Sequence, residues 1–438
     1  MKFDLGKTLL LAVLITLAGV NIQAQGNKLT LDDCIEMALQ NRYSIIAARG
    51  SEDLAKAGQR SALGAFLPRV SASYSYYESK TRDLKTQLEG FPEETQPDQD
   101  GSGETISASA SMTLFDLANF FDYASARANR AAARLDVINS EHDLIYSVKL
   151  AYYAYLANVE NVKVQEQAVA RSEEQLKLIT SRYELGSASK SDVLKQKVQY
   201  GNDRLALLRA NNAVVTSKAT LAYTIGLEPN GDVEFSSDYD IREFTGTMDE
   251  ALQYGLAHEP GLLASGKSLA AAKNSVRSGY SSYLPVLTGS ASYSISDGSS
   301  GDTLLYNSSS KTTRYGLTAS WNIFDGFIRE SYVTSAKVSR NNARAALADT
   351  RNLVVQEIKT AYFDAEQQKL AKEVASENVD AANEDLKITQ EKYNLGAATI
   401  LDLLDAQVSL KQAQVSMIQA DFDLNLAIAQ LENAMGKM

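Results

Sequence analysis

Nearly the whole chain consists of two copies of one sequence unit, and this internal repeat restricts the possible folds more than any other feature. Leu114-Phe115-Asp116 returns as Ile323-Phe324-Asp325, and Arg182-Tyr183-Glu184-Leu185-Gly186 returns as Lys392-Tyr393-Asn394-Leu395-Gly396. The offset between the copies stays at about 210 residues, and a constant offset is typical of chains built from repeated supersecondary units. We therefore expect a first structural repeat at 25–228, an inter-repeat connection at 229–245 and a second structural repeat at 246–438.

Each repeat is predicted to contain one very long helix. Residues 117–185 and 327–395 contain neither glycine nor proline, and each run, if helical, extends roughly 100 Å at 1.5 Å per residue. Apolar residues recur at steps of three and four in the first run, as helix packing requires: Leu144, Val148, Ala151, Tyr155, Val159 and Val162. This spacing alone also fits an ordinary coiled coil.

Four short segments alternate between apolar residues and Ser or Thr, which predicts strands with one apolar and one polar face. They lie at about 69–78, 106–115, 286–295 and 315–323. A strand of about ten residues with this alternation has the length that crosses a membrane in a barrel. An exposed soluble sheet is the alternative interpretation.

A membrane barrel has to close, because unpaired backbone groups cannot face lipid, and the smallest barrels need about eight strands. One chain offers only four. A closed trimer supplies twelve strands, and the same symmetry also closes the long helices into a tube. The polar inserts at 78–105 and 296–313 then lie together at one end of the barrel.

The first residues have the pattern of a secretory signal peptide. Lys2 and Lys7 precede an apolar stretch, so we expect a leader at 1–24 and a mature chain that begins near Gln25. No later stretch of the sequence approaches the length of about 18 consecutive apolar residues that a transmembrane helix needs. The only cysteine, Cys34, does not directly follow the leader, so we expect no lipid anchor and no disulfide, and we interpret Cys34 as a core residue.

Both long helical runs are followed by glycine-containing turns with a recurring pattern. The segment Tyr393-Asn-Leu-Gly396-Ala-Ala-Thr399-Ile-Leu-Asp402-Leu-Leu-Asp405-Ala406 has a shorter partner, Tyr183-Glu-Leu-Gly186-Ser-Ala-Ser189-Lys-Ser-Asp192. With the Leu-Pro pairs that precede a strand in each repeat, these residues make the chain resemble the TolC family of outer-membrane efflux ducts over essentially its full mature length.

The resemblance implies a mainly α fold with a small membrane β-barrel: two tandem helix-strand-strand-helix-turn-helix repeats, and a trimeric 12-stranded β-barrel continuous with a long α-helical barrel. It implies a homotrimer in the outer membrane of a Gram-negative bacterium, in contact with outer-membrane lipid and with a large periplasmic portion. Its role is then that of a passive exit duct in a tripartite efflux or type I secretion system, served by a periplasmic adaptor and an inner-membrane pump. No cofactor and no catalytic activity are expected, and the net charge of −11 argues against binding to nucleic acid.

Asp402 and Asp405 are the predicted pore constriction. They are three residues apart and therefore share one face of a helix, and in a threefold tube they contribute six carboxylates to the lumen, which favours cations. Such crowded carboxylates are expected to raise one another's pKa. The alternative is an ordinary solvated acidic face.

The family resemblance also marks Asp192 and Tyr393 as contacts that hold the duct closed. A local helix cap is the alternative role for Asp192. The family pattern has Arg where this chain has Ala398, so one such contact is missing.

The family resemblance also implies that the two turns are the docking tips for the adaptor, formed by Leu185, Gly186, Leu395, Gly396 and Thr399. The two glycines are expected at positive φ, where glycine is the favoured residue. Leu185 and Leu395 are expected to be tucked beneath the turns.

Competing functions have weaker support. Residues 261–268 fit the phosphate-binding loop pattern, but the segment before them has a helical pattern rather than that of a buried strand, so we do not expect ATP binding. His142 and His258 have no companions at metal-ligand spacing, and a hydrolase lacks a plausible catalytic constellation. A periplasmic coiled-coil adaptor or structural protein remains the main rival.

Overall fold

The computed structural model describes residues 28–82, 85–86, 94–95, 99–231, 233–237, 244–300 and 307–438. The predicted signal peptide and the expected start near Gln25 lie outside the described residues. Parts of the two polar inserts and of the connection at 229–245 lie outside them as well.

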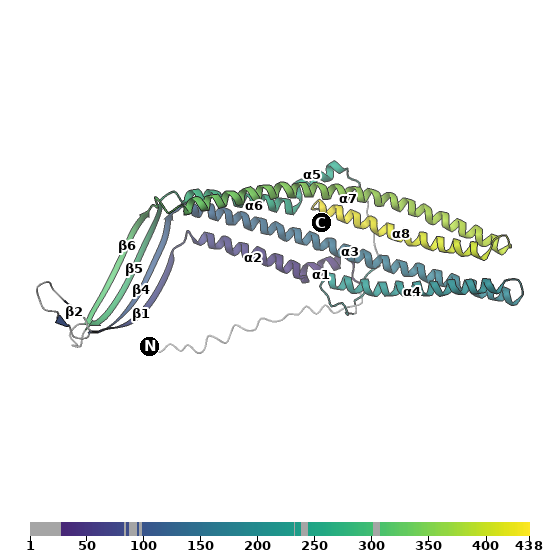
Figure 1. Ribbon diagram of the computed structural model, residues 1–438, viewed down its shortest axis with the longest axis horizontal. Coiled ribbons are helices and arrows are strands. Elements are labelled where there is room, and N and C mark those ends of the chain that lie inside the picture. Colours follow the sequence, from purple (N-terminus) through teal and green to yellow (C-terminus); the bar gives the residue numbers. More distant parts are fainter. Residues whose placement is uncertain are drawn as a thin grey trace.

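The molecule is elongated, with a sheet at one end and two helical hairpins at the other (Figure 1). The helices are α1 (Leu31–Asn41), α2 (Tyr43–Gly64), α3 (Leu117–Glu184), α4 (Lys190–Thr224), α5 (Met248–His258), α6 (Pro260–Ser281), α7 (Ile328–Asn394) and α8 (Ile400–Ala434). The strands are β1 (Arg69–Thr81), β2 (Lys85–Thr86), β3 (Glu94–Thr95), β4 (Gln99–Phe115), β5 (Val286–Ser300) and β6 (Asn307–Ser320).

Four long strands form one antiparallel sheet in the order β1-β4-β5-β6. The pairing places like residues side by side: Val70 lies opposite Ala110, and Ala110 opposite Ala291. Ser71 lies opposite Ser109, and their hydroxyl oxygens are 2.9 Å apart. Because side chains alternate between the faces of a strand, this register gives the sheet one apolar face and one face of Ser and Thr.

The strands differ in extent from those expected from the sequence. β4 begins at Gln99 rather than near 106, and β6 spans Asn307–Ser320 rather than 315–323. The added residues are rich in Ser, Gly and Thr, and their backbones pair although they lack apolar alternation. Trp321 lies beyond β6, where its Nε1 donates a hydrogen bond to the Tyr283 carbonyl at 3.0 Å.

The two long helices connect the sheet to the tips. α3 has 68 residues and α7 has 67. α3 packs against α2 and α6 toward the sheet and against α4 and α8 toward the tips, while α7 packs against α6 and α8. α3 and α7 are therefore the only two helices of the described chain that extend along both halves of the helical part (Figure 1).

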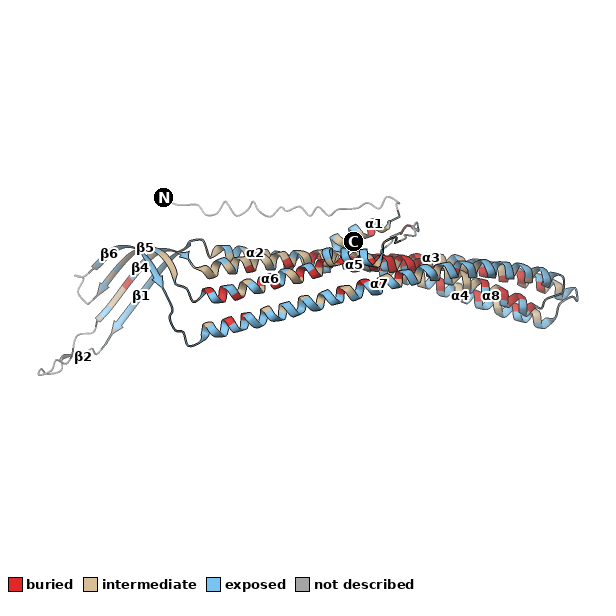
Figure 2. Ribbon diagram, turned by 90° about the horizontal axis from the view of Figure 1, so that it is seen from above, coloured by how far each residue is buried: buried red, intermediate tan, exposed pale blue. Residues whose placement is uncertain are grey.

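The largest core cluster lies at mid-length, where α1 meets α3. Leu144, Val148, Tyr152 and Leu156 of α3 are buried there together with Cys34, and Figure 2 shows buried residues gathered along this part of α3. The expected core position of Cys34 is confirmed, and burial raises the pKa of its thiol to about 12. The buried row of α3 runs through Tyr152 and Leu156 rather than through the expected Ala151 and Tyr155, which are half-buried.

Among the described residues, no helix has both the length and the apolar character needed to cross a membrane.

Candidate functional site: the hairpin tips and the acidic gate

Both hairpin tips are built in the same way. Gly186 has φ 79° and Gly396 has φ 76°, as expected for residues that follow a helix in the left-handed region. The Gly186 N–H donates to the Tyr183 carbonyl at 2.9 Å, and the Ser187 N–H donates to the Arg182 carbonyl at 2.8 Å. The second tip repeats both bonds, so each long helix ends in a Schellman motif.

The expected burial of Leu185 and Leu395 beneath the turns is wrong. Their side chains are 83% and 84% exposed. The space beneath the turns is already filled by a separate core cluster of α3, α4 and α8 that contains Ile179, Val193 and Leu403. The two leucines therefore extend into solvent at the end of the molecule.

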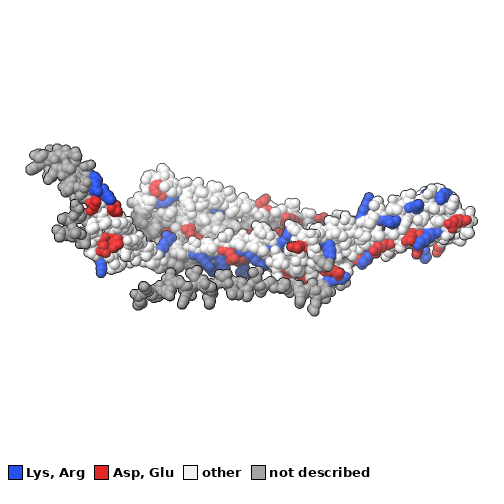
Figure 3. Space-filling view, turned by 90° about the horizontal axis from the view of Figure 1, so that it is seen from below, with Lys and Arg blue, Asp and Glu red and all other residues white. Residues whose placement is uncertain are grey.

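The two tips contact each other through Arg182. Its Nη2 donates a hydrogen bond to Asn394 Oδ1 at 3.2 Å, and its guanidinium carbon lies 5.3 Å from the centre of the Tyr393 ring. These contacts hold the end of α3 level with the end of α7. Lys and Arg are interspersed with Asp and Glu over this end of the molecule (Figure 3).

Asp192 and Asp402 are capping residues within their own helices. The Thr399 N–H and hydroxyl each donate to Asp402 Oδ2 at 2.7 Å, and the Ser189 hydroxyl donates to Asp192 Oδ2 at 2.7 Å. These are capping boxes, and the Ser or Thr three residues before each Asp was the sequence signal for them. Donation by the Thr399 N–H, and then by its hydroxyl, lowers the pKa of Asp402, opposite to the direction expected for a crowded ring.

The single chain does not join Asp192 to Tyr393. In the described part of the chain, the hydrogen bonds of the Asp192 carboxylate go to Ser189, and Tyr393 is half-buried beside Arg182. Asp402 and Asp405 do share an exposed side of α8, since the neighbouring Leu403, Leu404 and Ala406 are buried.

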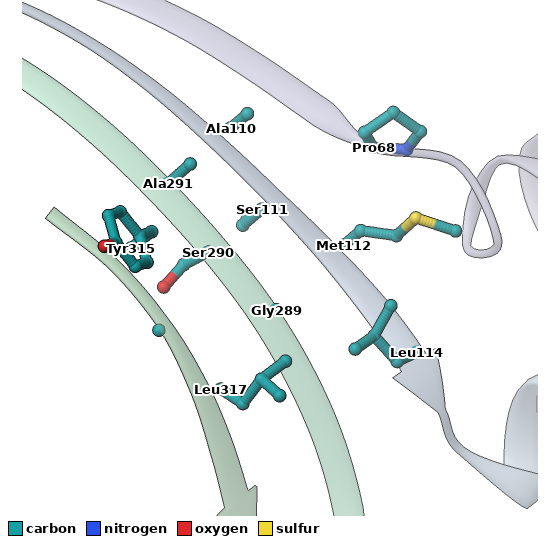
Figure 4. A pocket seen from close by; sticks show the side chains of 11 residues that line it. Pro68, Ala110, Ser111, Met112, Leu114, Gly289, Ser290, Ala291, Tyr315 and Leu317 are labelled. Atoms are coloured by element: carbon teal, nitrogen blue, oxygen red, sulfur yellow. The ribbon is translucent and has the colours of Figure 1, made fainter.

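The sheet carries an apolar pocket of about 450 Å³ on its apolar face. Figure 4 shows Met112 and Leu114 of β4 and Tyr315 and Leu317 of β6 around it, with Gly289 of β5 between them. Tyr315 is 83% exposed. An exposed apolar patch of this kind indicates a surface that contacts a partner protein, a ligand or a membrane.

The other candidate sites have ordinary structural roles. The residues with the phosphate-loop pattern, 261–268, lie inside α6, so they form a helix and not a loop. His258 Nδ1 lies 2.9 Å from the Tyr254 carbonyl oxygen, and the two rings are stacked. No group of His, Cys, Asp and Glu suited to a metal ion is found in the residues that the structure describes.

Comparison with known proteins decides the family. The sequence model of the outer membrane efflux protein family matches residues 34–227 and 251–437. The chain belongs to this family. Its members are channel proteins of efflux systems, so this outer membrane efflux protein is a channel component in the outer membrane of a Gram-negative bacterium.

Relatives of similar length support this assignment. The chain is 23% identical to the outer membrane efflux protein BepC of Brucella suis over 98% of this chain and 90% of BepC. It is 22% identical to the outer membrane protein TolC of Vibrio cholerae over 93% of this chain and 91% of TolC.

Solved channels share the fold. VceC of Vibrio cholerae superimposes with a TM-score of 0.76 at 23% identity, over 93% of this chain and 96% of VceC. The Campylobacter jejuni channel CmeC gives a TM-score of 0.79 at 17% identity, over 93% of this chain and 85% of CmeC. The fold of this chain is thus that of the outer-membrane channels.

Proposed function

We propose that three copies of the chain close into one duct with a 12-stranded barrel and a long α-helical tube. The observation that carries this proposal is the open four-stranded sheet. Its outer strands, β1 and β6, each have one edge without a partner among the described strands. Because an open edge cannot face lipid, β1 of one copy pairs with β6 of the next, and three copies close the ring.

The two faces of the sheet support the same proposal. The apolar face with the pocket around Met112 and Tyr315 faces lipid, and the face of Ser and Thr lines the lumen. Pairs such as Ser73 and Ser107, whose hydroxyl oxygens are 2.7 Å apart, bond to each other across the strands, and Arg314 lies on the same face opposite Ser292, so this face is polar. Each subunit contributes two repeats, 25–228 and 246–438, joined at 229–245.

The tube receives its cargo at the tips. In this proposal a periplasmic adaptor grips the tips, an inner-membrane pump supplies the energy, and the duct is the passive exit of a tripartite efflux or type I secretion system. The exposure of Leu185 and Leu395 supports docking, since the two side chains form apolar points at the end of an otherwise charged surface. Gly186, Gly396 and Thr399 set the shape of the turns that present them.

The gate lies just inside the tips. Asp402 and Asp405 of three copies form the narrow, cation-selective part of the tunnel, because their carboxylates share one exposed side of α8. A contact between Asp192 and Tyr393 of neighbouring elements holds the closed state, with Ala398 leaving one contact absent. In the open state Asp192 retains its capping bond to Ser189.

The test is the stoichiometry and conductance of the detergent-extracted protein. We expect a particle with three times the mass of the mature chain, backbone amides of β1 and β6 that resist hydrogen exchange, and cation-selective channels in planar bilayers. Replacement of both Leu185 and Leu395 by Asp should leave the trimer and the conductance intact. It should weaken cross-linking to the adaptor. A stable monomer whose β1 and β6 amides are protected would overturn the proposal.

A further inference from the structure

The Ser and Thr face of the sheet carries positive charge and no negative charge. Arg69 of β1 lies opposite Ser111 of β4, and Arg314 of β6 lies opposite Ser292 of β5. Because side chains alternate between the two faces of a strand, both arginines share the face of the serines. They are the only charged residues on this face of the four long strands that the structure describes.

The acidic residues of these strands lie on the other face. They occupy the alternate positions of the register: Glu78, Asp100, Glu104 and Asp297. Some of them already have partners on that face, since Lys80 Nζ lies 3.2 Å from Glu78 Oε1 and the Tyr74 hydroxyl donates to Glu104 at 3.2 Å. The described strands therefore offer the two arginines no carboxylate on their own side of the sheet.

Neither arginine is neutralised elsewhere in the chain. Arg69 and Arg314 are both exposed, and neither has an ion pair among the residues that the structure describes. Their neighbours along the same two rows are hydroxyl side chains, such as Ser290 beside Ser111 and Ser109 beside Ser292. Guanidinium groups are donors only, and hydroxyls can donate as well, so an anion meets hydrogen-bond donors here without any competing negative charge.

The two arginines form a narrow band near the end of the sheet that adjoins the helices (Figure 1). Arg69 is the first residue of β1, and the row that contains Arg314 crosses β1 at Ser71. These rows are two residues apart, which is about 7 Å along a strand. Since β1 and β6 are three strand spacings apart, about 14 Å, one chain supplies two separate guanidiniums. We call Arg69 and Arg314 the arginine band.

We propose that the arginine band binds polyanions, that is, solutes that carry several phosphate or carboxylate groups. The proposal rests on the threefold duct proposed above, in which the Ser and Thr face lines the lumen and three copies with two arginines each supply six. A guanidinium matches a phosphate or a carboxylate with two parallel hydrogen bonds. A solute with several such groups contacts the arginines of several copies at once, whereas a small anion meets only one or two.

The arginine band gives the duct two regions of opposite charge. Asp402 and Asp405 lie near the tips, and α7, which joins the sheet to the tips, has 67 residues and extends roughly 100 Å. Charges in physiological salt are screened beyond about 8 Å, so the carboxylates do not compensate the arginines. A polyanion that enters from the sheet end therefore reaches the arginines without passing the carboxylates.

Binding of inorganic tripolyphosphate to the full-length trimer tests the proposal. Calorimetry is carried out at constant ionic strength, in a neutral detergent and again in phosphatidylcholine nanodiscs. We expect binding in both media, because the lumen stays open to water when lipid covers the outer face. Arg69→Gln combined with Arg314→Gln should weaken binding by about tenfold or more, since hydrogen bonds to charged groups are lost.

Two further variants separate recognition by guanidinium from net charge. Lys80→Gln with Lys311→Gln removes two positive charges from the same two strands, β1 and β6, but on the other face, and it should bind tripolyphosphate as the parent does. Arg69→Lys with Arg314→Lys keeps the charge and loses the two parallel bonds, so its affinity should fall between those of the parent and the Gln variant. Equal weakening by the lysine and arginine substitutions to Gln would show an effect of net charge and overturn the proposal.

Ion selectivity in planar bilayers provides the second test. Loss of both arginines should shift the reversal potential in a salt gradient toward that of a more cation-selective channel, because fixed charge in a lumen attracts ions of the opposite sign. The variant with Lys80→Gln and Lys311→Gln should keep the parent value. An unchanged reversal potential without the arginines would contradict their position in the lumen.

The outcomes distinguish this proposal from the duct itself. A trimer that does not bind tripolyphosphate, or that binds it equally well without the arginines, overturns the arginine band and leaves the duct standing. Binding that is present in detergent and lost in nanodiscs would place the arginines on the lipid-covered face and also overturn the proposal. A protein that is not trimeric overturns the duct first.

Discussion

Replacement of Gly186 by Val tests whether the turn at the end of α3 depends on the positive φ of this residue. A Cβ built on Gly186 meets nothing within 4 Å, whereas its φ is +79°, so the substitution adds strain without a steric clash. A non-glycine residue held in this region costs about 1 to 3 kcal/mol, which is roughly a 5- to 150-fold increase in local opening, because 1.4 kcal/mol corresponds to tenfold.

Hydrogen exchange at the tip measures this opening. The Ser187 N–H, bonded to the Arg182 carbonyl, should exchange faster by that factor in Gly186→Val and by a smaller factor in Gly186→Asn, since Asn tolerates positive φ better. The trimer should persist while export falls.

The matched control is Gly58→Val in α2, where an added Cβ also meets nothing within 4 Å and φ is that of a helix. It should leave the tip amides unchanged. Parent-like exchange at Ser187 in Gly186→Val, with export and adaptor cross-linking also unchanged, would refute the reasoning.

Three further predictions follow from the gate and the interior of the helical layer. Replacement of both Asp402 and Asp405 by Ala should lower cation selectivity in planar bilayers and weaken block by trivalent cations; parent-like selectivity would assign the charge ring to other residues. Hydrogen bonds from Thr399 lower the pKa of Asp402, so the ionised carboxylate stabilises the start of α8. This stabilisation is present above the ordinary pKa of 3.8 and is lost as the pH falls below that value. Hydrogen exchange at Asp402 N–H should show this loss, and Asp402→Asn should remove its pH dependence. Asp203 is buried, and its Oδ1 lies 2.8 Å from Lys411 Nζ. Lys411→Met removes this ion pair and should destabilise the fold by about 3 to 5 kcal/mol in urea unfolding. Lys411→Met with Asp203→Leu should recover most of the lost stability, and equal loss in both variants would contradict the pairing.

The long helices and the sheet were accessible to prediction because their signals are local. The stretches without Gly and Pro, 117–185 and 327–395, differ by one residue at most at each end from α3 and α7, since a helix continues until a residue such as Gly186 favours another conformation. Strand alternation located the apolar parts of the strands. The polar extension of β4 to Gln99 carries no such pattern, because its pairing depends on backbone bonds that any residue can make.

The candidate site was harder to predict from the sequence, because the exposure and the bonds of its side chains depend on which other residues pack around them. Leu185 follows an apolar helical pattern, yet Ile179 and Leu403 already occupy the core beneath the turn, so the leucine is exposed. Asp402 was singled out by its three-residue spacing to Asp405, whereas its hydrogen bonds depend on Thr399 three positions earlier.

The concentration of buried side chains at mid-length has a mechanical consequence. Packing around Tyr152 and Leu156 is dense, whereas the part of α7 nearest the sheet is largely exposed (Figure 2). Dense packing resists deformation, so the helices are expected to be stiffer at mid-length than toward either end. A sideways force on the tips is then expected to bend the tip-side parts of α3 and α7 and to leave the strands, roughly 100 Å away, undisturbed.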